Sequence, residues 1–195
     1  MTDGSELRLF VAIELEEAVL RALGDLQGEL RGRGLDWLRW TRSEGIHLTL
    51  KFLGETPRDR LSAITGAVER AATGHKKHGL ALGRMGTFGS RRSPRVLWVD
   101  LTGDLEELRA LQASVDEALA SIGFPKEERR FSPHLTLARV PPEKAGEVVE
   151  SLAAAVESVR VPTAEVRVDE VSLMQSTLGR GGAVYDRLAR VGLDD

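Results

Sequence analysis

The stretch His47-Leu48-Thr49-Leu50 recurs, residue for residue, as His134-Leu135-Thr136-Leu137. The two copies lie 87 positions apart in a chain of 195 residues, and they take up two of its four histidines. At the same spacing, the strand-like run 10–13 falls onto 97–100. Because there are only two copies, this spacing indicates duplication of one structural unit rather than an array of repeats.

The hydrophobic pattern around these stretches predicts strands that alternate with helices along both halves of the chain. Apolar residues at helical spacing predict amphipathic helices at 16–30, 58–72, 104–121 and about 143–158. Strands are expected at 7–15, 37–40, 46–53, 80–88, 95–101, 133–140, 165–174 and 183–191. We therefore expect an α/β fold of the α+β type over residues 1–195, as a single bilobal domain. In this pseudo-two-fold duplication, two mostly antiparallel sheets flank a central cleft and the helices lie outside.

The composition excludes several classes of site. The chain has no cysteine, so disulfides, thiol nucleophiles and thiolate-bound metals are excluded. The longest apolar runs have five residues, too few to cross a membrane. A net charge of −3 argues against broad coating of duplex nucleic acid, but it leaves room for a small basic pocket. Residues 1–6 are polar and predict no secretion signal, and with the absence of cysteine they favour a cytoplasmic location.

The repeated tetrapeptide presents an imidazole and a hydroxyl on the same face of a strand. Side chains alternate along a strand, so His47 and Thr49 share one face, as do His134 and Thr136. If the two halves face each other, two histidines oppose across a cleft. One can take a proton from an attacking water while the other gives a proton to the leaving oxygen. The threonine hydroxyls can donate hydrogen bonds to phosphate oxygens. Spacing alone also allows a structural role for both histidines.

Strict alternation also predicts the residues that follow each tetrapeptide. It places Lys51 on the face of His47 and Phe52 on the core face. In the second copy it places Arg139 on the leucine face, whereas a bulge would turn Arg139 toward the phosphate. The sequence leaves these two positions of Arg139 open.

Longer stretches around both tetrapeptides resemble the two-histidine phosphoesterase superfamily. Within it, the chain is similar to the RNA 2',3'-cyclic phosphodiesterases of the 2'-5' RNA ligase family. The resemblance is carried by residues 8–13, 38–40, 46–54, 94–98, 131–139 and 171–176, and by Tyr185. It implies hydrolysis of the 2',3'-cyclic phosphate at an RNA end to a 2'-phosphate.

The resemblance also implies individual roles for the motif residues. His47 would be the proton donor toward the 3' oxygen, and His134 the proton acceptor that activates water. Thr49 and Thr136 would hold the phosphate. The residues themselves do not say which histidine acts as acid and which as base.

Two arginines beside the second motif are candidate substrate ligands. Arg130 precedes the motif and Arg139 follows it, and an arginine forms strong charge-assisted hydrogen bonds with phosphate. No cofactor and no metal are expected. His75 and His78 stand beside two lysines, which repel a cation, and the chain has no glycine-rich nucleotide-binding loop.

Other functions remain open at this point. The expected partner is RNA with a 2',3'-cyclic phosphate end, tRNA fragments among the candidates, bound by a monomer without a membrane. A phosphodiesterase or ligase acting on 2'-5' linkages, or on small cyclic nucleotides, is an alternative. A protein that binds RNA ends without catalysis is an alternative of another class.

Overall fold

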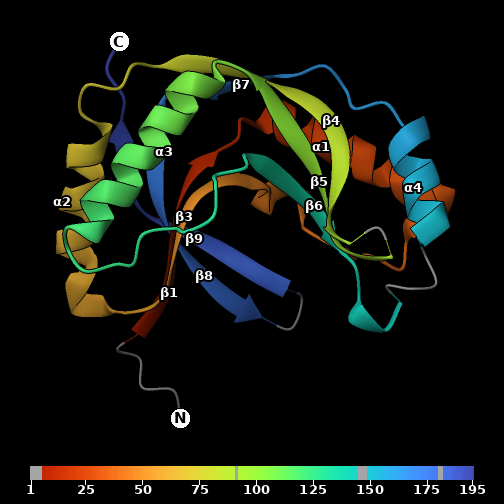
Figure 1. Ribbon diagram of the computed structural model, residues 1–195, viewed down its shortest axis with the longest axis horizontal. Coiled ribbons are helices and arrows are strands. Elements are labelled where there is room, and N and C mark those ends of the chain that lie inside the picture. Colours follow the sequence, from red (N-terminus) through yellow and green to blue (C-terminus); the bar gives the residue numbers. More distant parts are fainter. Residues whose placement is uncertain (1–5, 91, 145–148, 180–181) are drawn as a thin grey trace.

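The computed structural model describes residues 6–90, 92–144, 149–179 and 182–195. Over these residues, nine strands form one strongly curved antiparallel sheet with four α-helices against it (Figure 1). The strands are β1 (Glu6–Glu14), β2 (Arg39–Trp40), β3 (His47–Pro57), β4 (His78–Ser90), β5 (Ser93–Gly103), β6 (His134–Arg139), β7 (Glu165–Val168), β8 (Glu170–Gly179) and β9 (Gly182–Gly192). The helices are α1 (Glu17–Leu30), α2 (Leu61–Ala72), α3 (Leu105–Ala120) and α4 (Val149–Ser158).

The order of the strands divides the sheet into two halves. The order is β7-β4-β5-β6-β3-β1-β8-β9, with the short β2 paired to β6. The two motif strands, β3 and β6, meet at the centre through one residue pair, Leu48 with Leu135. The expected mixed α/β fold is confirmed, and its two antiparallel sheets are joined at this pair into one curved sheet.

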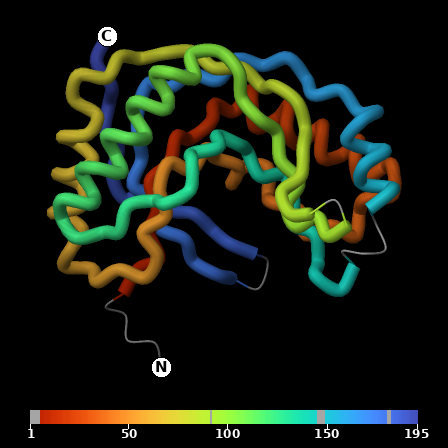
Figure 2. Tube along the Cα trace, viewed as in Figure 1, coloured from red at the N-terminus to blue at the C-terminus, as the bar shows by residue number. Residues whose placement is uncertain are grey.

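Each half of the sheet takes strands from both halves of the sequence. In Figure 2 the C-terminal strands, in blue, run beside the N-terminal strand, in red, since β8 pairs with β1. Helices α2 and α3 pack on the half formed by β3, β1, β8 and β9, while α1 and α4 lie on the other side of the molecule (Figure 1). The duplicated sequence units have therefore exchanged strands.

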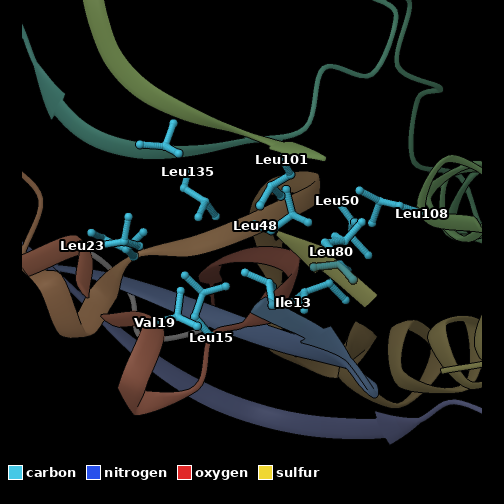
Figure 3. Packing of buried hydrophobic residues seen from close by; sticks show 14 of the residues in the cluster. Ile13, Leu15, Val19, Leu23, Leu48, Leu50, Leu80, Leu101, Leu108 and Leu135 are labelled. Atoms are coloured by element: carbon cyan, nitrogen blue, oxygen red, sulfur yellow. The ribbon is translucent and has the colours of Figure 1, made fainter. Parts of the chain in front are cut away.

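The core lies between the sheet and its helices. The motif leucines point into it, and Leu48 and Leu135 lie side by side in Figure 3. Leu23 of α1 and Leu108 of α3 are fully buried in the same core. Burial of each such leucine contributes about 1.5–3 kcal/mol. The inward leucines thus fix which face of each motif strand is left for the histidine and the threonine.

A bulge at the last leucine of each tetrapeptide overturns one prediction made by strict alternation. Val11 pairs with Lys51 and Ala12 with Thr49, so Leu50 is an extra residue on β3. Lys51 therefore points inward, where it is only 7% exposed and binds Asp116 and the carbonyl of Pro125. Phe52, predicted to enter the core, is instead 69% exposed.

The second motif strand has the same irregularity. Leu97 pairs with Ala138 and Trp98 with Thr136, so Leu137 is the extra residue on β6. The bulge turns Arg139 onto the face of His134, which decides between the two positions that the sequence left open. Phe52 and Arg139 occupy equivalent places in the two halves.

Most predicted elements are present with boundaries shifted by a few residues, but the single strand expected at 165–174 is wrong. It is two strands, β7 and β8, which pair with β4 and with β1 respectively. The helix expected at about 143–158 begins at Val149 in the described residues, and 145–148 lie outside them. The expectation about residues 1–6 rests on positions of which 1–5 also lie outside the described residues. Among the described helices, none has the length and apolar character needed to cross a membrane.

Candidate active site

A cavity of about 520 Å³ lies where the two halves of the sheet meet. His47, Thr49, His134 and Thr136 all line it, together with Arg139. Residues separated by 87 positions are thus brought to a single site. Arg130 is exposed and does not line this cavity.

The walls of the cavity carry positive charge. Among the described lining residues none is acidic, and the permanent charges are those of Arg8 and Arg139. Arg8 enters from β1 and Arg139 from β6, so cations reach the site from both halves. In a chain with a net charge of −3, this local excess favours an anionic ligand.

Both histidines are held in the same way. The Nδ1 atom of His47 lies 2.8 Å from the carbonyl oxygen of Gly45, and that of His134 lies 2.8 Å from the carbonyl oxygen of Ser132. A carbonyl oxygen only accepts, so Nδ1 carries the hydrogen in each ring. This leaves Nε2 of each histidine as the nitrogen that can accept a proton when the ring is neutral or donate one when it is charged.

Aromatic side chains fix the planes of the two imidazoles. Phe10 stacks on His47 with ring centroids 4.7 Å apart, and Tyr185 contacts it in an edge geometry at 4.9 Å. Phe88 packs against His134 in an edge geometry at 4.7 Å. The chain thus orders both rings before any ligand binds, which reduces the entropy lost on binding.

Burial shapes the titration of both rings. Burial lowers the pKa of His47, opposed by the Gly45 carbonyl and the carboxylate of Glu14, while the facing His134 lowers it further. Burial also lowers the pKa of His134, opposed by the Ser132 carbonyl and reinforced by the guanidinium of Arg139. Both rings therefore favour the neutral form in the free protein.

Buried glutamines support the two motif strands where they separate. Nε2 of Gln27, on α1, donates to the carbonyl of Leu137 at 3.0 Å and to that of Thr41 at 2.8 Å. Nε2 of Gln112, on α3, donates to the carbonyl of Leu50 at 3.4 Å. Each glutamine thus satisfies the carbonyl of the last leucine of one tetrapeptide.

Several residues that line the cavity were not predicted from the sequence as site residues. Arg8 and Phe10 stand two apart on β1, and Leu178 and Tyr185 come from β8 and β9. Alternation places Arg8 and Phe10 on one face of a strand, but it does not indicate that this face lines the cavity. Nothing in the sequence indicated that β8 would pair with β1 and that β9 would pair with β8.

Comparison with known proteins places this site in a family. The family model described as the 2'-5' RNA ligase superfamily matches residues 38–180. The chain belongs to this superfamily. The matched residues include both tetrapeptides and the strands β3 and β6 that carry them.

Curated relatives share one name. A Thermotoga maritima protein named RNA 2',3'-cyclic phosphodiesterase is 31% identical over 92% of this chain and 91% of its own length. A Methanothermobacter thermautotrophicus protein of the same name is 29% identical over 92% and 95%. A Geobacillus stearothermophilus protein of that name is 33% identical over 67% of this chain, which spans only 41% of that relative's length.

Solved structures agree with the fold. Escherichia coli LigT, in a crystal structure described as complexed with 3'-AMP, is 26% identical, with a TM-score of 0.75 over 97% of this chain and 99% of LigT. The protein TT0787 of Thermus thermophilus is 29% identical, with a TM-score of 0.72 over 96% of this chain and 98% of its own.

Proposed function

We propose that this chain hydrolyses the 2',3'-cyclic phosphate at an RNA end to a 2'-phosphate. The observation that carries the proposal is the convergence of two His/Thr pairs and Arg139 on one cavity. The name shared by the curated relatives supports the substrate class. We propose tRNA fragments among the substrates, a monomer as the active form and the cytoplasm as its location.

The proposed reaction is an in-line displacement at phosphorus by water. Nε2 of His134 takes a proton from the water as the new phosphorus–oxygen bond forms. Nε2 of His47 gives a proton to the 3' oxygen as the bond between phosphorus and that oxygen breaks. Thr49 and Thr136 donate hydrogen bonds to the non-bridging oxygens, and Arg139 balances their charge. Every proton and charge in this scheme has a side chain assigned to it, so no metal or cofactor is included.

The apolar part of the cavity suits the nucleoside. Phe52 and Leu178 line it and are 69% and 74% exposed, so they offer a surface that no other part of the described chain covers. Aromatic side chains stack on any base, which makes such a contact tolerant of sequence. We place the terminal base against Phe52. Arg130 is proposed as a contact to RNA beyond the cavity.

The deciding experiment uses an oligoribonucleotide that ends in a 2',3'-cyclic phosphate, incubated with the protein in EDTA. We expect a 2'-phosphate product, and a loss of rate of about 10²–10⁴-fold in His47→Ala and in His134→Ala. His78→Gln, outside the cavity, should keep full activity.

Three outcomes would contradict the proposal. Full activity in His134→Ala would exclude the two-histidine mechanism. A 3'-phosphate product would mean that the bond between phosphorus and the 2' oxygen breaks, and not the bond to the 3' oxygen. Binding of the RNA end without product favours an RNA-end binding protein. Comparison with a mononucleotide 2',3'-cyclic phosphate and with a 2'-5'-linked dinucleotide separates the two alternative substrate classes.

A further inference from the structure

The sheet places one acidic residue beside each motif histidine. In the register of β1 and β3, Glu14 is the partner of His47. In the register of β5 and β6, Asp100 is the partner of His134. Residues directly opposite on antiparallel strands put their side chains on the same face and close together. The duplication therefore gives each imidazole a potential carboxylate neighbour.

The two carboxylates are used differently. Oε2 of Glu14 accepts a hydrogen bond of 2.6 Å from the fully buried Ser172 and one of 3.0 Å from Arg187. These bonds fix Glu14 on the face it shares with His47. Asp100 is engaged by the next strand instead, because its Oδ1 accepts the backbone N–H of Arg84 at 2.6 Å.

The second histidine meets a cation, Arg139, whereas its register partner Asp100 is paired with the guanidinium of Arg84. The bulge on β6 turns Arg139 onto the face of His134, while its equivalent on β3 is the uncharged Phe52. An anion beside an imidazole favours its charged form, and a cation disfavours it. The two halves therefore differ in the sign of the charge that each histidine meets.

We propose that Glu14 is a positioning residue that assigns the acid role to His47, with Ser172 and Arg187 holding its carboxylate in place. Glu14 does not touch the substrate. It acts by stabilising the protonated ring of His47, so that the pseudo-symmetric site has one proton donor and one proton acceptor.

The other charged groups around this pair do not supply the same effect. From β9, Arg187 is bound to Glu14, and Tyr185 contacts His47 through its ring. From β6, His134 faces His47 and repels its charged form. Three further ion pairs lie around Glu14, and they join Arg190 to Glu170, Arg167 to Asp169 and Arg167 to Glu16. Glu14 is thus the anion that acts on His47, and it raises the pKa of that ring against burial.

The direct test follows the titration of both histidines by NMR in the whole protein. Glu14→Gln should lower the pKa of His47 and leave that of His134 nearly unchanged. Arg187→Gln should raise the pKa of His47, because the carboxylate of Glu14 loses its counter-ion. Asp100→Asn is the matched control and should move neither ring. The inference is overturned if His47 does not respond to Glu14→Gln, or if Asp100→Asn has an equal effect on His134.

The kinetic consequence rests on the proposed function. A lower pKa of the acid moves the alkaline limb of the pH–rate profile to lower pH. With Glu14 and His47 interacting as strongly as a part-exposed ion pair, the kcat of Glu14→Gln should fall about two- to fivefold at pH values above that limb. At pH values below the limb, kcat should change little. A uniform loss at every pH, or a loss that follows the unfolding midpoint, indicates a structural role and overturns the inference. If the protein does not hydrolyse cyclic phosphates, the NMR titration still decides the role of Glu14, so the two failures are distinguishable.

Discussion

At the scale of single residues, the site holds two neutral imidazoles in a cavity whose charged lining residues are Arg8 and Arg139. Burial lowers the pKa of His47 and of His134, in each case against a hydrogen bond to a backbone carbonyl. A phosphate bound between them reverses this balance, because its negative charge favours the protonated rings. Anion binding and protonation of the site are therefore coupled.

This coupling predicts proton uptake on binding of a 2'-nucleotide monophosphate. At pH 7.5 the phosphate is mostly dianionic, so the protons taken up belong to the histidines. Binding raises their pKa, and the affinity should therefore fall as pH rises. Calorimetry in buffers with different ionisation enthalpies measures the uptake, and His47→Gln should reduce it. An observed binding enthalpy that does not depend on the buffer contradicts the prediction.

At the scale of elements, the bulges on β3 and β6 determine what reaches the cavity. They bury Lys51 and expose Phe52 in one half, and they expose Arg139 in the other. The same backbone irregularity thus gives the site a ring on one side and a cation on the other. This asymmetry suits a substrate with a base attached to a phosphate.

The exposed ring leads to a prediction that separates the cavity from the core. Phe52→Ala should raise KM for an RNA that ends in a 2',3'-cyclic phosphate about 5- to 160-fold, since stacking contributes about 1–3 kcal/mol per base. The free energy of unfolding should change little, because Phe52 is 69% exposed. Leu188→Ala, another exposed apolar residue outside the cavity, is the control for both measurements. Strong destabilisation without a change in KM would contradict the prediction and indicate that Phe52 has a structural role.

The same bulges mark the limit of what alternation could predict. The leucines and the His/Thr face follow from a period of two, and the structure has them as expected. An extra residue in a strand leaves no trace in that period, so Lys51 and Phe52 were exchanged between faces. Lys51 and its equivalent Ala138 share no polarity, and only the structure shows that both are buried.

At the scale of the whole molecule, the duplication is visible in the sequence but its strand exchange is not. The repeat predicts two equivalent units, and β3 and β6 are indeed equivalent in the sheet. Pairing between β1 and β8, however, depends on contacts between residues more than 150 positions apart, such as Phe10 and Met174. Local patterns carry no information about such pairs, which explains why the pairing of β8 with β1 was not predicted.

Strand exchange predicts that neither half of the sequence folds alone. A fragment of residues 1–91 retains β1, β3 and β4. In this fragment β1 lacks its partner β8, and β4 lacks its partner β5. A fragment of residues 92–195 loses β1 from β8 and β4 from both β5 and β7. Each fragment therefore exposes unpaired strand edges and half of a core, which argues against stability. We expect no cooperative thermal transition by circular dichroism in either fragment, and recovery of one when they are mixed. A cooperative transition in an isolated fragment would mean that the sequence halves, and not the exchanged halves of the sheet, are the folding units.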